Sequence, residues 1–207
     1  MTTRDRLLQR VRQNKPEPLP LPEVPLFVNE TDDLLARFRD AVAFVGGQLV
    51  ELPGEASLSD VIRHRFPNSQ RIASSVPLSN VTLTTIGPET DKLILEQIDV
   101  AVLRGEFVVA ENAAVWLPEA NMLHRALPFI AQHLMLIVGR DALVPNMHVA
   151  YQRIHPDRTG GAFTGYGAFI AGPSKTADIE QSLVIGAHGA RSLTVVLMTN
   201  GPDLTVD

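Results

Sequence analysis

The 207-residue chain contains no cysteine. It can therefore form no disulfide bond, no thiolate nucleophile and no iron–sulfur cluster ligated by its own side chains. This excludes a cysteine-ligated redox centre within the chain. The composition identifies no other cofactor.

Long hydrophobic runs and excess positive charge are also missing. No apolar run approaches the roughly 20 residues that a membrane-spanning helix needs. The first 13 residues are charged and lack the apolar core of a signal peptide, so we expect a cytoplasmic protein without a membrane span. A formal net charge of −5 argues against a nucleic-acid partner, because affinity for phosphate backbones depends on clustered Lys and Arg.

Metal and nucleotide motifs are absent as well. The six histidines show no H-x-x-x-H pair or other spacing typical of metal ligands, so we expect no metal site. Gly165-Tyr166-Gly167 lacks the remaining glycine of a dinucleotide loop, and residues 172–176 lack the longer frame of a phosphate loop.

The N-terminal region is expected to form an arm separate from the domain. Residues 1–13 predict an amphipathic helix with Leu7, Leu8 and Val11 on one face and arginines around the rest. We interpret it as a helix that docks on the domain or on a partner subunit, so an oligomer is possible. Five prolines between residues 15 and 25 then predict an extended linker. The boundary is placed at 1–29 for the arm and 30–207 for a single domain.

Beyond the arm, helical and strand patterns alternate. Strands are predicted at 48–52, 71–74, 100–103, 107–110, 133–138, 168–171 and 193–198, with residues 115–117 forming a hairpin with 107–110. Helices are predicted at 31–45, 57–66 and 145–154, and a loop at 155–167. Thr31 and Ser57 are the candidate caps of the first two helices, and Gly46-Gly47 ends the first. The alternation predicts an α/β fold with a mostly parallel sheet and helices on both faces. Trp116 is most simply a core residue.

Polar and backbone-limiting residues follow the strand at 168–171. Gly172 and Pro173 predict a turn, and Ser174 or Thr176 can cap a following helix whose first turn holds Asp178 and Glu180. Strand–loop–helix junctions often bind ligands through free backbone N–H groups, and Lys175 would add positive charge. The capping role and the ligand role can coexist.

Glu111 and His188 are the leading ionisable candidates. Glu111 follows an apolar strand, where partial burial could raise its pKa and let it act as an acid or a base. The alternative is a surface residue or a helix-cap partner. His188 lies between Gly186 and Gly189 and can bind an anion or transfer a proton, or act as a structural donor. Arg125 can clamp a carboxylate or phosphate, or form a surface ion pair.

The chain resembles the lactate-utilisation protein C family, whose members carry the LUD domain. The resemblance rests on Gly172 to Glu180, which match GPS-x-TADIE, and on Gly186 to Gly189, which match G-x-HG. It extends to the segments 109–112 and 124–128. The chain departs from the family pattern at two places. Asn112-Ala113 stand where the family usually has a small polar residue followed by Gly, and Ala190 stands where it commonly has Pro.

The resemblance implies a fold similar to the sugar-phosphate isomerase and CoA-transferase superfold. It also implies a subunit of a system that oxidises L-lactate to pyruvate, with iron–sulfur clusters in separate partner subunits. A small anionic ligand would bind in a crevice at the strand ends. The residues expected there are Glu111 and His188 as acid or base, and Asn112, Arg125, Gly172, Pro173, Ser174, Lys175, Thr176, Asp178, Glu180 and Gly189 as ligand contacts.

Two alternatives from other classes remain open. One is a stand-alone enzyme that performs group transfer or ATP-dependent ligation on a phosphorylated or folate-like substrate. The other is a non-catalytic scaffold or metabolite-sensing subunit.

Overall fold

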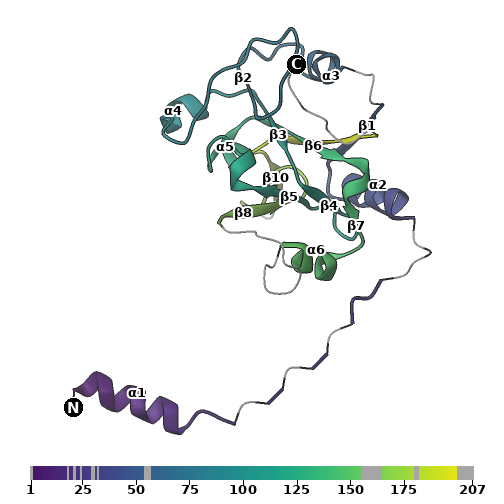
Figure 1. The fold of residues 1–207 in the computed structure, drawn as a ribbon. Helices are drawn as coiled ribbons and strands as arrows, with labels where there is room; N and C mark the ends of the chain where they lie inside the picture. Colours follow the sequence, from purple (N-terminus) through teal and green to yellow (C-terminus); the bar gives the residue numbers. More distant parts are fainter. Residues whose placement is uncertain are drawn as a thin grey trace.

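The computed structural model describes residues 2–17, 19–20, 22–23, 25–28, 31, 33–53, 57–154, 165–179 and 182–199. Figure 1 shows a body built around a central sheet, with a helix and an extended arm at the N-terminal end. The helices are α1 (Thr3–Gln13), α2 (Leu34–Phe44), α3 (Leu58–Arg65), α4 (Lys92–Leu95), α5 (Leu127–Ile130) and α6 (Met147–Ile154), with 3-10 turns at Glu119–Asn121 and Arg140–Ala142.

The central sheet of the described chain is parallel throughout and has the order β1-β11-β6-β3-β2. Its strands are β1 (Gln48–Leu52), β2 (Ile72–Ser74), β3 (Val100–Arg104), β6 (His133–Gly139) and β11 (Ser192–Met198). β6 and β11 are buried almost from end to end, because both faces of the sheet are covered. Near-continuous apolar runs of this kind are typical of parallel sheets.

Side chains alternate between two cores on the two faces of this sheet. On one face, Met135 and Ile137 of β6 pack with Val196 of β11 and with Ile62 of α3. On the other face the neighbouring residues pack against α2 and a second sheet; they include Leu134, Leu136, Val138, Leu193, Val195 and Leu197. Ser57 caps α3 as the sequence predicts, whereas Asp33 rather than Thr31 caps α2.

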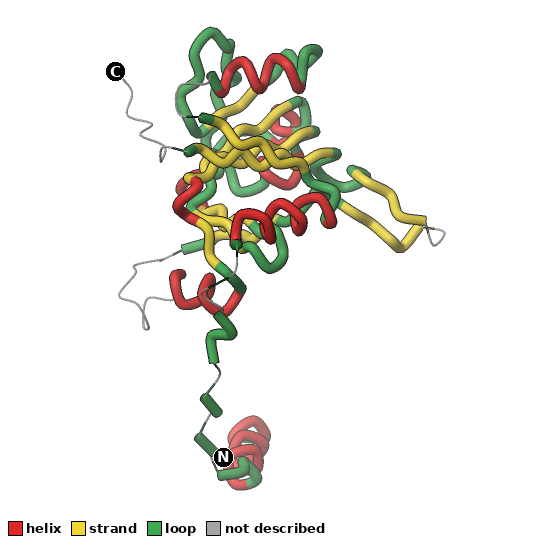
Figure 2. The backbone as a smooth tube through the Cα atoms, turned by 90° about the vertical axis from the view of Figure 1, so that its right-hand side faces the viewer, coloured by secondary structure: helices red, strands yellow, loops and turns green. Residues whose placement is uncertain are grey.

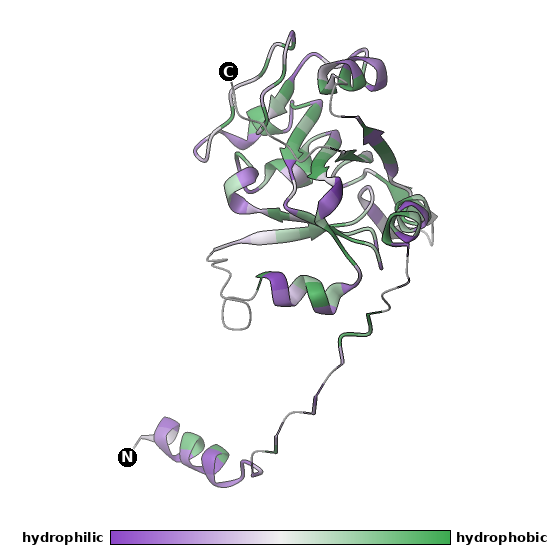
Figure 3. Ribbon diagram, turned by 45° about the vertical axis from the view of Figure 1, so that its right-hand side comes forward, coloured by the Kyte–Doolittle hydropathy of each residue, from purple (hydrophilic) through white to green (hydrophobic). Residues whose placement is uncertain are grey.

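The second sheet has the order β7-β4-β5-β8 and is mixed. It comprises β4 (Phe107–Val109), β5 (Val115–Pro118), β7 (Leu143–Val144) and β8 (Gly167–Ile170). Its outer face packs on α6 through Phe107, Trp116 and Phe169, whose rings contact one another. Trp116 is thus a core residue. Figure 3 shows the resulting apolar interior in green between the layers.

These layers confirm the α/β fold with a mostly parallel central sheet in a single domain. The helices, however, do not cover both faces by themselves. α3 covers one face, while α2 shares the other with the second sheet, because β4 and β5 present Val108, Val115 and Leu117 to the same core as α2. The predicted hairpin between 107–110 and 115–117 is present as the antiparallel pair β4 and β5.

The helix predicted after Gly172 is wrong. Residues 175–179 form strand β9 (Lys175–Ile179), which pairs antiparallel with β10 (Ser182–Ile185). Figure 2 shows this hairpin projecting from the body. Thr176 therefore pairs with Val184 in a ladder and caps no helix, and Asp178 lies in a strand. The loop predicted at 155–167 lies mostly outside the described residues, as does Glu180.

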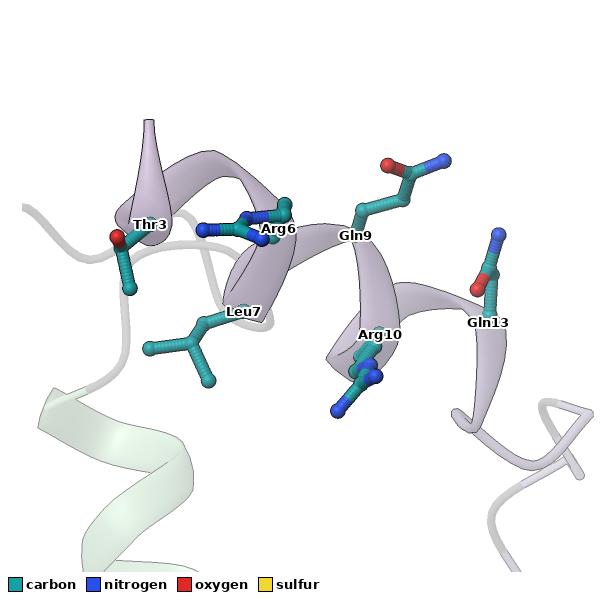
Figure 4. Close-up of a pocket in the computed structure, with 6 residues that line it drawn as sticks. All are labelled: Thr3, Arg6, Leu7, Gln9, Arg10 and Gln13. Atoms are coloured by element: carbon teal, nitrogen blue, oxygen red, sulfur yellow. The ribbon is translucent and has the colours of Figure 1, made fainter. Parts of the chain in front are cut away.

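The N-terminal helix α1 forms as predicted and lies apart from the body (Figure 1). A reciprocal capping box between Thr2 and Asp5 begins it, and none of its residues is buried. Figure 4 shows the side chains around a surface hollow that is lined, among the described residues, by α1 alone. The end of the arm does reach the body, where Asn146 Nδ2 donates to the carbonyl of Leu26 at 2.6 Å.

We expect Gly105→Ala to lower the free energy of unfolding by about 1–3 kcal/mol. Gly105 joins β3 of the first sheet to β4 of the second, and an added Cβ would lie 2.5 Å from Val115 Cγ1 and 2.8 Å from Val138 Cγ2. Urea denaturation measures the change. Gly87→Ala is the matched control, since a Cβ there meets nothing within 4 Å. Equal stability of the two variants would contradict the tight packing of the sheets.

Deleting residues 2–13 should leave the free energy of unfolding unchanged to within about 0.5 kcal/mol. The reason is that α1 buries no residue against the body. The measurement is urea denaturation of the full and shortened chains at two protein concentrations. A larger loss that is independent of concentration would mean that α1 docks on its own domain, as the sequence pattern allowed.

Candidate functional site

The two halves of the C-terminal motif meet in space. The Ser174 N–H donates to the Ala190 carbonyl at 2.8 Å, and the Gly186 N–H donates to the Ser174 carbonyl at 2.9 Å. We call residues 172–175 and 186–190 the signature cluster. Ser174 thereby joins the start of the β9–β10 hairpin to the loop that leads into β11. The cluster lies at the amino end of the parallel strands, since β11 begins at Ser192.

Two glycines allow this close assembly. Gly172 has φ +74°, and a Cβ there would lie 2.5 Å from the carbonyl oxygen of Val45 at the end of α2. A Cβ at Gly189 would lie 2.8 Å from the Phe129 carbonyl oxygen and 3.1 Å from Ser174 Cβ. Both motif glycines are therefore required by backbone conformation or close approach. This explains the residue types without reference to a ligand.

The charged groups of the cluster stay at its surface. Lys175 is exposed, and its Nζ lies 3.7 Å from the position that a Cβ on Gly46 would take, beside the carboxyl end of α2. His188 is exposed on the neighbouring loop, whereas Pro173 is buried. A lysine ammonium complements the negative end of a helix dipole, and an exposed ammonium can also attract an anion.

Glu111 does not have the buried environment expected from its strand-end position. Its side chain is exposed, and its Oε2 accepts a hydrogen bond from the Met147 N–H at 2.9 Å. Met147 is the first residue of α6, so the carboxylate satisfies a free N–H and adds negative charge at the helix amino end. Glu111 therefore acts as a helix-cap partner, which is one of the alternatives that its position in the sequence allows.

Asn112 lies beside Glu111 in the tight turn between β4 and β5. Its Oδ1 accepts from the Ala114 N–H at 3.1 Å, and Ala113 adopts φ +61°. β5 pairs with β8 so that Val115 faces Ile170. Gly172 follows Ile170 by two residues, so this turn and the signature cluster occupy the same end of the second sheet.

Arg125 is not part of this assembly. Its guanidinium pairs with Glu119 through Nε and Nη2 and lies 5.6 Å from the centre of the Tyr166 ring. Glu119 and Tyr166 lie at the end of the β5–β8 ladder where Pro118 faces Gly167, opposite to the end from which Gly172 follows. This pair raises the pKa of Arg125 and lowers that of Glu119, mainly through their hydrogen bond. The surface ion pair is thus the arrangement observed.

The LUD domain family model matches residues 87–198, which include both halves of the signature cluster and the Glu111 turn. The chain belongs to the LUD domain family. "Lactate utilization protein C" of Geobacillus kaustophilus is 30% identical to this LUD protein over 174 residues, which cover 81% of this chain and 70% of that one. The protein of the same name from Oceanobacillus iheyensis is 31% identical over 115 residues, which cover 55% and 49% respectively.

The LUD fold is supported by a solved structure as well. A DUF162 family protein from Deinococcus radiodurans superimposes with a TM-score of 0.58 at 18% identity, covering 80% of this chain and 96% of that one. In the described part of this LUD chain, no helix is long and apolar enough to cross a bilayer. No group of three or more His, Asp or Glu side chains among those residues could hold a metal ion.

Sequence reasoning missed two contributors to the LUD signature cluster. The sequence pattern marks Gly46 only as the end of a helix, yet Gly46 lies against Lys175 and Pro173. Phe129 supplies the carbonyl that approaches Gly189. The Gly46-Gly47 pair was a usable signal, since two glycines exceed what a helix end requires. Nothing in the pattern around Phe129 indicated its position.

Gly172→Ala should destabilise the LUD domain by about 3 kcal/mol or more, because it combines a left-handed backbone with a clash against the Val45 carbonyl. Gly46→Ala is the matched control. It shares the positive φ, but its Cβ would make only ordinary contacts of 3.7 Å or more, so we expect a loss of about 1–2 kcal/mol. Thermal and urea denaturation measure both. Equal losses would contradict close packing at Gly172.

Proposed function

We propose that this chain is a cytoplasmic subunit of an L-lactate utilisation system and binds a small anion at the signature cluster. The relatives named lactate utilization protein C support the lactate role. The cysteine-free sequence supports a division of labour in which separate iron–sulfur subunits carry the electrons. The single observation that carries the ligand proposal is the convergence of the two motif halves through Ser174, with Lys175 and His188 exposed beside it.

In this proposal the chain's own groups bind and orient the anion. Lys175 supplies a positive charge on a long side chain, and His188 supplies a ring that can donate a hydrogen bond or transfer a proton. Glu111 and Asn112 would contribute from the β4–β5 turn, which lies at the same end of the second sheet. Thr176 and Asp178 follow along β9, while Glu180 lies outside the described residues. The contribution of all three stays a prediction.

Contact with partner subunits is supported by exposed apolar side chains outside the core. Leu183 and Ile185 on the projecting hairpin are 61% and 53% exposed, and Leu7 and Val11 on α1 are 60% and 67% exposed. Apolar side chains that gather on protruding elements are typical of surfaces that bind other chains. We infer that the hairpin and α1 are the elements through which iron–sulfur partners are held.

The test is growth on L-lactate of the source strain with this gene deleted and supplied with variants. We expect the native chain and the control Lys92→Gln to restore growth, since Lys92 is exposed on α4 far along the chain from the motif. Lys175→Gln should fail, because it removes the same charge from the signature cluster. Growth on pyruvate, the product of lactate oxidation, should be equal in all strains.

Glu111→Gln separates two roles of that residue. The amide oxygen of Gln can still accept from the Met147 N–H, so α6 stays capped while the negative charge is lost. Failure on L-lactate with unchanged stability would assign the carboxylate to the site chemistry. If each of the two single variants, Glu111→Gln and Lys175→Gln, restores growth, the scaffold alternative is favoured instead. Unchanged growth of the deletion strain would refute the lactate role.

A further inference from the structure

A second depression lies at the amino ends of β1, β6 and β11, next to the end of α3. It has a volume of about 600 Å³, within the range of small-molecule sites. Its described lining residues are Gln48, His64, Arg65, Phe66, Pro67, Asn68, Ser69, His133 and Ser192. They include two histidines and an arginine and no Asp or Glu, in a chain whose formal net charge is −5.

This depression is separate from the signature cluster because it lies on the other face of the central sheet. Strand side chains alternate in direction, so His133 shares a face with Met135 and Ile137, which pack in the core under α3. Ser192 likewise shares a face with Val196. The neighbouring residues Leu134 and Leu193 point into the opposite core, toward α2 and the second sheet.

The polar groups around His133 are held in place. Its Nδ1 lies 2.8 Å from Ser192 Oγ, and its ring lies 4.9 Å from the ring of Phe66. Nε2 has no hydrogen-bond partner among the described residues, so it is the nitrogen that a ligand can reach. Arg65 is oriented from α3 by a hydrogen bond from Nη1 to Gln48 Oε1, which leaves its other N–H groups available.

Two charges outside the lining also act on His133. Burial and the positive charge of Arg191, just before β11, lower the pKa of His133, while Asp99, just before β3, acts in the opposite direction. Oδ2 of Asp99 accepts from the N–H groups of Gln70 and Arg71 at 2.8 and 2.9 Å. Thr194 of β11 lies on the same face of the sheet as His133. Its buried hydroxyl has no hydrogen-bond partner in the described part of the chain.

We propose that this depression, the His133 cavity, binds a small oxyanion. The anion would accept hydrogen bonds from Arg65 and from Nε2 of His133, and the Phe66 ring would form the apolar wall. A carboxylate and a phosphate share this chemistry, since both present oxygen acceptors to a guanidinium fork. The site is independent of the proposed lactate role, because none of its lining residues belongs to the signature cluster.

The experiment titrates the full, isotopically labelled chain with inorganic phosphate at constant ionic strength, with chloride as the reference salt and acetate as the carboxylate probe. NMR follows the ring signals of His133. We expect a saturable shift with phosphate or acetate, and the probe that binds more tightly identifies the class. Binding should tighten as the pH falls, because protonated His133 adds a charge, and the pKa of His133 should rise when the anion is bound.

Arg65→Gln should weaken the binding about tenfold or more, the size expected for loss of a charge-assisted hydrogen bond. Arg63→Gln is the matched control. It removes the same charge from the same helix, but Arg63 pairs with Asp60 and does not line the cavity. Thermal melting confirms that both variants fold. No saturable shift, an unchanged pKa of His133, or equal weakening by the two variants would overturn the proposal.

Discussion

The face-to-face packing of the two sheets is the constraint on which the rest of the molecule depends. β6 and β11 bury both faces, so their alternating side chains must satisfy two separate cores at once. Gly105 lets the chain pass from β3 into β4 in close contact with Val115 and Val138, where a larger residue would not fit. Because the second sheet is fixed in this way, three segments lie at one end of its strands: the Glu111 turn, the start of α6 and the end of β8.

The signature cluster at this end of the sheet is assembled mainly from backbone contacts. The Ser174 backbone donates a hydrogen bond to Ala190 and accepts one from Gly186, and Gly172 lies against Val45. Much of the motif is thereby accounted for by close approach and backbone conformation. The charged side chains, Lys175 and His188, are those that the assembly leaves exposed. The motif therefore joins a structural element, which explains its glycines, to a surface on which ligand chemistry is available.

Two polar regions border the amino ends of the central strands, one on each face of the sheet. The signature cluster adjoins α2 and the second sheet, while the His133 cavity adjoins α3. In open parallel sheets, ligands usually bind beyond the carboxyl ends of the strands. Here the loop preceding β11 brings polar residues to the amino end instead, because the β9–β10 hairpin precedes β11 and returns the chain there.

The sequence by itself determined the elements whose signals are local. The apolar runs of β3, β6 and β11, the Ser57 cap of α3 and the hairpin of β4 with β5 were all predictable, because period and capping act within a few residues. Only the tertiary structure decided that residues 175–179 pair as a strand, since Ser174 is held by partners 12 and 16 residues away, which overrides a local helix-start pattern. It also decided that Glu111 caps a helix 36 residues downstream and that Arg125 pairs with Glu119 away from Gly172. Such roles depend on which distant segments meet, and that is set by the packing of the sheets.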